Sequence, residues 1–164
     1  MFSIGDCVVY PYHGAGRVEK IEEKEILGNK LLYFVVYFPL NQVTLMLPEN
    51  KIGESGLRPV ISKKELDDVV ESLCEEVEAR ETAATAKPYS RENEALLKTG
   101  SIYDAARVIS LLNAKKSERA NGLHIEDRKN LERATQFLVS EIKNINGFSE
   151  EDAKLFIKNN IPVT

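Results

Sequence analysis

The chain has 164 residues, of which 43% are hydrophobic and 29% are charged, and its formal net charge at pH 7 is −4. This length suits one domain or two small ones, and the composition is ordinary for a soluble protein with a packed core. The negative charge argues against a protein that coats nucleic acid non-specifically, so a nucleic-acid site would have to be a local basic patch.

Residues 2–18 predict two short strands joined by a turn. The segment has no positively charged lead and no sustained apolar run, so we expect no signal peptide. Pro11 lacks an amide donor and should end the first strand. Gly14 and Gly16 allow backbone angles, or a close backbone approach, that a side chain would forbid. This segment predicts the first hairpin of a small barrel, which makes a binding module the leading hypothesis.

The chain continues to about residue 60 with further strand signals. Gly28-Asn29 is a turn signal, and residues 31–38 form a near-continuous apolar strand. The longest apolar stretch, residues 31–40, has about half the length of a membrane helix, so we expect no membrane span. Five short strands without an intervening helix predict a small antiparallel barrel of the SH3-like or Tudor-like type.

The pattern changes to helical spacing from Ser62 onward. Capping residues and glycines divide this half into helical segments near residues 62–77, 90–97, 101–119, 125–144 and 149–162. The fold class we predict is therefore an α+β two-domain protein. Residues 1–61 form a Tudor-like β domain, and residues 62–164 form a compact all-α domain of four to five helices.

No catalytic or metal-binding constellation emerges from the sequence. His13 and His124 fall in different predicted domains, and neither has a second His or Cys at metal-ligand spacing. Cys7 and Cys74 make no CxxC pair and are expected to be reduced, buried thiols. We therefore expect a protein that is not an enzyme and that has neither a cofactor nor a metal.

The charge distribution is more informative than the net charge. Residues 107–133 contain seven basic side chains against four acidic ones. Lys115, Lys116 and Arg119 end one predicted helix, and Arg128 and Lys129 begin the next, so a helix-turn-helix corner should gather both groups. The helix dipole accounts for cations at a helix end but not for cations at a helix start. The corner is therefore a candidate phosphate-binding site, with a solvated surface as the alternative.

A second candidate contact lies at the predicted start of the helix near residue 90. Tyr89, Ser90 and Arg91 place an aromatic ring, a hydroxyl and a guanidinium side by side. A hydroxyl and helix amides suit a phosphate, and a flat ring can wedge into a groove or stack on a base. The alternative is that Tyr89 is a packing residue.

Together these motifs resemble the CarD family of bacterial transcription regulators, of the CdnL type, over nearly the whole chain. The N-terminal half also resembles the RNA-polymerase-interacting domain of the transcription-repair coupling factor. The resemblance rests on the run Gly5-Asp6-x-Val8-Val9-Tyr10-Pro11-x-His13-Gly14-Ala15-Gly16, on Val43 to Pro48, and on Tyr89-Ser90-Arg91, Leu97-Lys98-x-Gly100-Ser101, Gly122-Leu123 and Asp127-Arg128-Lys129.

The resemblance implies a non-enzymatic regulator with two partners. The β domain would dock on the β subunit of bacterial RNA polymerase, partly by edge-strand recognition. The helical domain would reach promoter DNA at the upstream edge of the melted region and stabilise the open complex. The polymerase contacts implied are Lys24, Tyr33, Thr44, Leu45, Met46 and Pro48. The DNA contacts implied are Tyr89, Ser90, Arg91, Lys98, Lys115, Lys116, Arg119, Arg128 and Lys129.

The chain also differs from many members of this family. Tyr89 stands where many have a tryptophan wedge, and Met46 stands where an arginine is common, which implies a more apolar polymerase contact. We expect a monomer that is cytoplasmic and associated with the nucleoid through polymerase. The competing hypothesis is an adaptor that binds polymerase or another protein without contacting DNA. A reader that binds through an aromatic cage is disfavoured, because aromatics that alternate along a strand usually fill a core.

Overall fold

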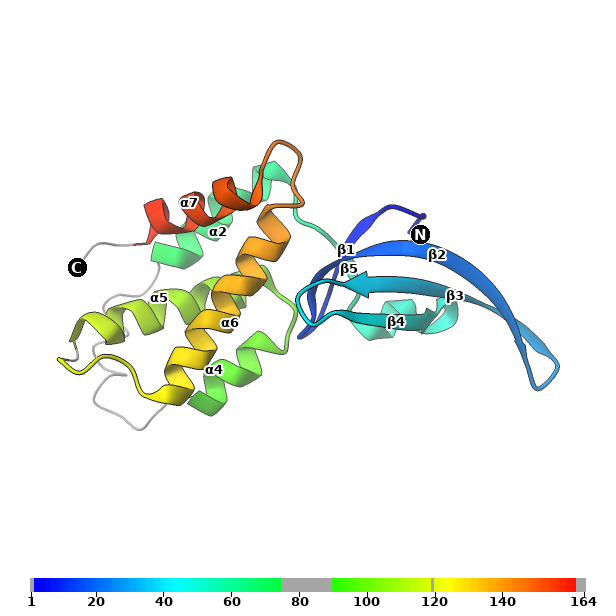
Figure 1. The fold of residues 1–164 in the computed structure, drawn as a ribbon, viewed down its shortest axis with the longest axis horizontal. Helices are drawn as coiled ribbons and strands as arrows, with labels where there is room; N and C mark the ends of the chain where they lie inside the picture. The colour runs from blue at the N-terminus through cyan, green and yellow to red at the C-terminus, as the bar shows by residue number, and fades with distance from the viewer. Residues whose placement is uncertain (1, 75–89, 119, 162–164) are drawn as a thin grey trace.

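The computed structural model describes residues 2–74, 90–118 and 120–161. Figure 1 shows a curved β-sheet domain beside a bundle of helices, with a short connection between them. The predicted α+β class, with a Tudor-like β domain followed by a helical domain, is confirmed.

The N-terminal domain is one five-stranded sheet in the order β4-β3-β2-β1-β5, and all neighbouring strands are antiparallel. The long β2–β3 hairpin projects away from the helices (Figure 1). Its turn consists of Leu27 and Gly28, which both have positive φ, as hairpin turns of this length prefer. The strands are β1 (Cys7–Tyr10), β2 (Gly14–Ile26), β3 (Asn29–Phe38), β4 (Val43–Pro48) and β5 (Arg58–Pro59).

The turn between β1 and β2 follows the sequence prediction. β1 ends at Tyr10, directly before Pro11. Gly14 has φ 74°, which is in the left-handed region. A Cβ at Gly16 would lie 2.6 Å from the carbonyl oxygen of Tyr37, so a side chain would collide with backbone that cannot move aside. Gly14 is therefore needed for its backbone angle and Gly16 for the close approach of another strand, which are the two reasons predicted for these glycines.

The core of the sheet comes from alternate residues on its inner face. Phe34, Val36 and Phe38 on β3 are fully buried there, together with Val8 and Val18. Because successive strand residues point to opposite faces, the odd-numbered residues of β3 lie on the other face. The 3-10 turn η1 (Glu49–Lys51) and the short helix α1 (Ile52–Ser55) lie between β4 and β5, so the prediction of five strands without an intervening helix is wrong at this point. Ile52 packs this helical segment against the core of the sheet.

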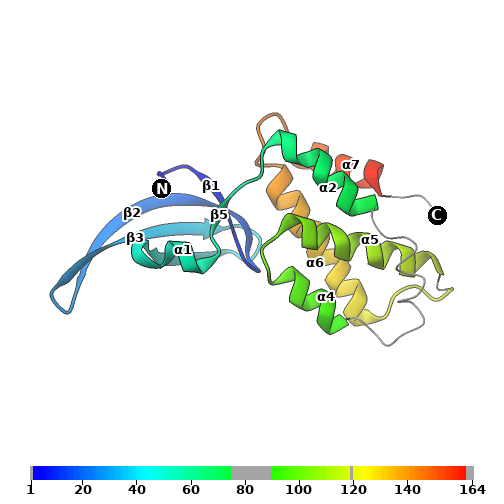
Figure 2. The same cartoon turned by 180° about the vertical axis from the view of Figure 1, so that it is seen from behind.

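The helical domain forms around one apolar core. Capping boxes start two of its segments: Ser62 with Glu65, and Ser149 with Asp152. Ala134, Leu138 and Ile142 are buried on one face of the longest helix, as their spacing predicted. Figures 1 and 2 show this helix crossing the bundle. The helices are α2 (Leu66–Cys74), α4 (Ser90–Leu97), α5 (Ile102–Glu118), α6 (Ile125–Ile142) and α7 (Glu150–Asn160), with the 3-10 turn η2 (Lys63–Glu65) before α2.

One expectation about the cysteines is wrong. Both thiols are free, as predicted, but Cys74 is exposed and Cys7 is only half-buried. Cys74 ends α2 at the surface, where its thiol lies 3.4 Å from the Asn160 carbonyl oxygen.

Within 2–74, 90–118 and 120–161, no helix combines the length and the apolar character that crossing a membrane requires. In the same ranges, no group of three or more His, Cys, Asp or Glu side chains could hold a metal ion.

Candidate functional site

One candidate surface is the face of the sheet opposite its core. Cross-strand pairing sets Tyr33 opposite Pro48 and Val35 opposite Met46, so these residues share that face. Lys24 joins them, because its Nζ lies 3.7 Å from the Met46 sulfur. Met46 is 40% exposed, on an edge strand that pairs only with β3 among the described strands. We call this surface the outer sheet face and define it as Lys24, Tyr33, Thr44, Met46 and Pro48.

Leu45 does not belong to this surface. It points to the inner face, where it packs against the buried core of the sheet. The structure therefore brings together five of the six residues that the resemblance implied for polymerase contact and gives the sixth a structural role. The period of two along a strand is the signal that separates Leu45 from Met46.

The predicted basic corner also forms, but one of its cations is already paired. The end of α5 meets the start of α6, where Lys115 Nζ lies 2.6 Å from Asp127 Oδ2. The two side chains are only 17% and 2% exposed, so Lys115 ties the helices together and is not available to a phosphate. Lys116 is exposed beside it. Arg128 is also exposed, and its guanidinium donates to the Leu123 carbonyl oxygen at 3.3 Å.

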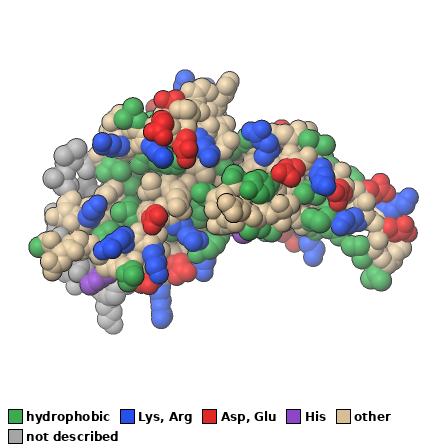
Figure 3. All heavy atoms as spheres, viewed as in Figure 1, with side chains coloured by type: hydrophobic (Ala, Val, Ile, Leu, Met, Phe, Trp, Pro, Cys, Tyr) green, Lys and Arg blue, Asp and Glu red, His purple; other side chains and the backbone are tan. Residues whose placement is uncertain are grey.

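A second candidate surface lies on α4 and α6. Arg91 lies in the first turn of α4, and Lys98 directly follows the last residue of that helix, Leu97. Lys129 and Arg133 are four residues apart on α6 and share one stripe of that helix. We call these four residues the α4–α6 basic face. Figure 3 shows Lys and Arg side chains distributed over this side of the bundle, with Asp and Glu among them.

Three predicted DNA contacts cannot be placed in this way. Tyr89 and Arg119 lie outside the described residues. The sequence predicts Ser90 at the start of this helix, and Ser90 is the first residue of α4. Its side chain lies outside the described part of the chain. The proposed aromatic wedge thus belongs to the segment that leads into the start of α4.

The two domains are joined by a buried ion pair that the sequence did not predict. Arg58 on β5 meets Glu141 on α6 through two hydrogen bonds of 2.6 and 2.7 Å. The Ile61 amide donates to the same carboxylate at 2.8 Å, and Arg58 also donates twice to the Gly100 carbonyl oxygen, at 3.0 and 2.7 Å. The Glu141 side chain is 3% exposed and that of Arg58 is 28% exposed. This network links a strand, the interdomain connection and two parts of the helical domain.

Close packing at the β1–β2 turn reinforces this joint. The Pro11 ring lies between Gly56 and Gly100, where an added Cβ would come within 2.8 and 3.1 Å of Pro11 Cγ. The Ala15 amide donates to Ser140 Oγ at 3.3 Å, which connects β2 with α6. The glycine-rich turn thus serves the contact between domains as well as the hairpin.

Comparison with known proteins bears on the whole chain. The family model described as "CarD-like/TRCF RID domain" matches residues 2–61, and the model described as "CarD, C-terminal domain" matches residues 68–158. The chain belongs to the CarD family. Members of this family are transcription factors, and this protein is a CarD-like transcription regulator.

Two relatives of this CarD-family protein illustrate the match. YdeB from Bacillus subtilis (strain 168), named as a candidate transcription factor, is 37% identical over 156 residues, which are 95% of this chain and 99% of YdeB. The solution NMR structure of the 72-residue N-terminal domain of Myxococcus xanthus CarD is 36% identical, covers 36% of this chain and 79% of that chain, and gives a TM-score of 0.31.

His13, which belongs to the N-terminal motif that runs from Gly5 to Gly16, has a packing role. Its ring stacks on Tyr10 at 5.5 Å between centroids and lies 5.4 Å from the ring of Phe38. Burial lowers the pKa of His13 from its ordinary value because the charged imidazolium is poorly solvated there. These contacts are those of a turn histidine that packs on the sheet.

Proposed function

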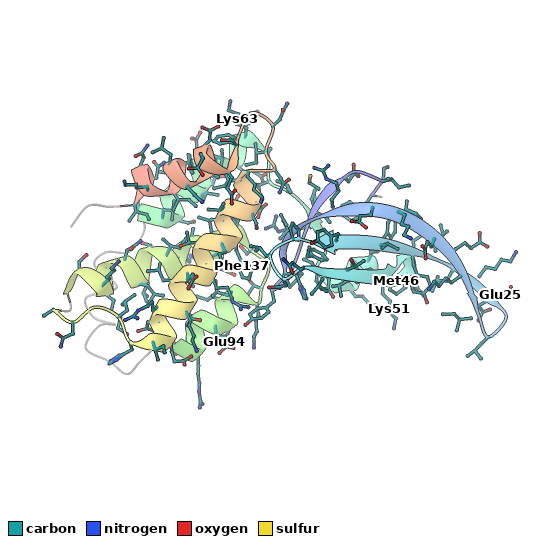
Figure 4. The ribbon with its side chains drawn as sticks, in the orientation of Figure 1. Glu25, Met46, Lys51, Lys63, Glu94 and Phe137 are labelled. Atoms are coloured by element: carbon teal, nitrogen blue, oxygen red, sulfur yellow. The ribbon has the colours of Figure 1, made fainter. Side chains whose placement is uncertain are left out.

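We propose that this CarD-family protein binds the β subunit of bacterial RNA polymerase through its sheet domain and promoter DNA through its helical domain, as a monomer on the nucleoid. Binding would stabilise the open complex at the upstream edge of the melted region. The observation that carries the proposal is the interdomain joint around Arg58 and Glu141, which connects the domain that bears the outer sheet face with the domain that bears the α4–α6 basic face. Figure 4 labels Met46 of the outer sheet face and Glu94 on α4, the helix that also carries Arg91.

The outer sheet face and the free edge of β4 suit a protein partner. An edge strand presents unpaired backbone amides and carbonyls that a strand of another chain can extend. Met46 supplies an exposed apolar side chain beside that edge, and Lys24 supplies a cation next to it. The match to the CarD-like/TRCF RID domain supports polymerase as this partner.

The helical domain offers cations for phosphates. In the proposal, the α4–α6 basic face holds the DNA backbone, with Lys116 and Arg128 as further contacts at the α5–α6 corner. Tyr89 would enter the minor groove as the wedge, with Ser90 and the start of α4 on a neighbouring phosphate. Such contacts are largely independent of base sequence, so promoter choice would come from polymerase and from DNA shape.

In the proposal, the joint accounts for how binding alone could change initiation. Once the sheet domain is bound to polymerase, the helical domain is confined near the DNA at a high effective concentration. It shifts the closed–open equilibrium only by the difference between its affinities for the two states. A fixed domain orientation favours the state whose DNA path meets the basic face.

The test is the lifetime of a polymerase–promoter open complex with and without the protein, at two salt concentrations. We expect the open complex to live longer with the protein than without it. This effect should shrink as the salt concentration rises, because phosphate contacts release counterions. Tyr89→Ala should keep polymerase binding and lower the stability of the open complex by about 1–3 kcal/mol, the scale of one lost stack. Equal lifetimes with wild type and Tyr89→Ala would refute the wedge.

The alternative function is that of an adaptor that binds polymerase or another protein without touching DNA. The acidic residues on α4 favour it: Glu92 and Glu94 are both exposed, and Glu94 lies 3.5 Å from Lys98. Polymerase binding without any change in open-complex lifetime would establish this alternative.

A further inference from the structure

A strained tyrosine lies where the two domains meet. Tyr12, in the turn between β1 and β2, has φ 70°. This left-handed region is unfavourable for a bulky side chain, and such outliers cluster at functional positions. The ring packs edge-on against Phe137 of α6, at 6.3 Å between centroids and an interplanar angle of 68°. Phe137 lies on the side of α6 that faces the sheet domain (Figure 4).

The same ring contacts two cations, Lys98 from the turn that follows α4 and Arg133 from α6. Lys98 Nζ lies 5.6 Å from the Tyr12 ring centroid, and Arg133 Cζ lies 4.7 Å from it. Both distances are within the range of cation–π attraction, which is about 6 Å. A residue of the sheet domain therefore contacts two members of the α4–α6 basic face.

The positive charges of Lys98 and Arg133 are only partly balanced by neighbouring carboxylates. Lys98 has Glu94 as a neighbour at 3.5 Å, but both side chains are about half exposed, so water screens the pair. Arg133 has no carboxylate oxygen within 4.0 Å among the residues that the structure describes. A guanidinium that lies on an aromatic face still presents its N–H edge, which is the edge that binds phosphate.

We propose that Lys98 and Arg133 form a phosphate-binding site for the DNA backbone at the domain joint, with Tyr12 as its positioning residue. This inference rests on the proposed DNA contact and adds that the polymerase-binding domain itself orients part of the DNA-binding surface. The DNA backbone is the occupant because further cations lie on the neighbouring helices: Arg91 on α4, which ends directly before Lys98, and Lys129 one turn before Arg133 on α6.

The experiment measures the factor by which the wild-type protein and each variant lengthen the open-complex lifetime. The measurement is repeated at salt concentrations from roughly 50 to 200 mM. Each variant is present at a concentration that saturates polymerase. Each phosphate contact contributes about 0.9 to the slope of log affinity against log salt. The Lys98→Gln/Arg133→Gln variant should therefore have a slope shallower by about 1.8, or about twelvefold less change over this fourfold salt range. Lys30→Gln/Lys51→Gln, which removes two charges from the sheet domain, is the matched control and should keep the wild-type slope in this saturated assay.

Each outcome separates this site from the proposed function. If wild type lengthens the lifetime and Lys98→Gln/Arg133→Gln has the same slope, the site is wrong while the proposed function stands. If the variant instead loses polymerase affinity, these cations contact protein and the site is also wrong. If wild type binds polymerase without changing the lifetime, the proposed DNA contact itself fails, and the site with it.

Tyr12 is tested with two substitutions. Tyr12→Phe keeps the ring and should behave as wild type. Tyr12→Asn keeps a residue that tolerates the left-handed backbone but removes the ring, and it should make the slope shallower even where its thermal unfolding midpoint stays close to that of wild type. A folded Tyr12→Asn protein with the wild-type slope would show that the ring does not position the cations.

Discussion

Replacement of Glu141 by Gln tests whether the buried ion pair holds the two domains together. Its carboxylate accepts three hydrogen bonds of 2.6 to 2.8 Å, from Arg58 and from the Ile61 amide, in a nearly dry site. Glutamine has one acceptor and one donor group, so at least one N–H would face another N–H. Breaking a buried pair by changing one partner costs about 3–5 kcal/mol. We expect about 3 kcal/mol, because Arg58 keeps its bonds to Gly100 and remains partly hydrated.

The assay is equilibrium unfolding in denaturant, followed by the radius of gyration from small-angle scattering in the absence of denaturant. Glu141→Gln should lower the free energy of unfolding and increase the radius as the domains separate. Glu151→Gln, in an exposed pair with Lys154, is the matched control and should change neither. Arg58→Leu/Glu141→Leu should cost less than the sum of its single substitutions, because no charge is left buried and unpaired. A loss below about 0.5 kcal/mol for Glu141→Gln, with unchanged scattering, would refute this account of the joint.

The remaining predictions concern the protein surface, the helical corner and pH. Met46→Glu places a charge on the outer sheet face and should weaken polymerase binding about tenfold or more, which is about 1.4 kcal/mol. Circular dichroism of this variant should show an intact helical domain. An unchanged affinity for polymerase would mean that this face is not part of the interface. Asp127→Asn leaves Lys115 without its carboxylate partner and should lower the free energy of unfolding in denaturant by about 3 kcal/mol. The Lys115→Met/Asp127→Leu variant leaves no buried charge and should have nearly the wild-type free energy of unfolding. Equal losses in the two variants would argue against a buried charge effect. His13 has a lowered pKa when folded, so the unfolded chain, with a His pKa of about 6.5, binds more protons below that pH. Stability should therefore be complete above about pH 6.5 and fall as the pH drops below it, and His13→Asn should lose this slope between about pH 7 and 5; an identical slope in the variant would assign the effect to other groups.

Local chemistry explains why the sequence predicted the elements well. Pro11 acts through an absent amide donor, which needs no knowledge of distant residues, and β1 ends directly before it. The sequence also marked Gly16 as a position for a close backbone approach, but the group that approaches it, the Tyr37 carbonyl on β3, is known only from the structure. Ser62 and Ser149 form capping boxes with residues three positions later, so the helix starts were also readable. The alternation of strand residues also separates Leu45, which packs against the core of the sheet, from Met46 on the opposite face, whereas the resemblance placed both with the polymerase contacts.

The sequence by itself determined the α+β class, the end of β1 before Pro11 and the starts of the capped helical segments at Ser62 and Ser149, because these depend on signals within a few residues. Only the tertiary structure decided which charges meet. Arg58 and Glu141 are 83 positions apart, and Lys115 and Asp127 belong to different helices. No local pattern distinguishes a lysine that faces solvent from one that is buried against a carboxylate. Tyr12 meets Lys98 and Arg133 only because the two domains pack together, so the positions of these cations are a property of the joint.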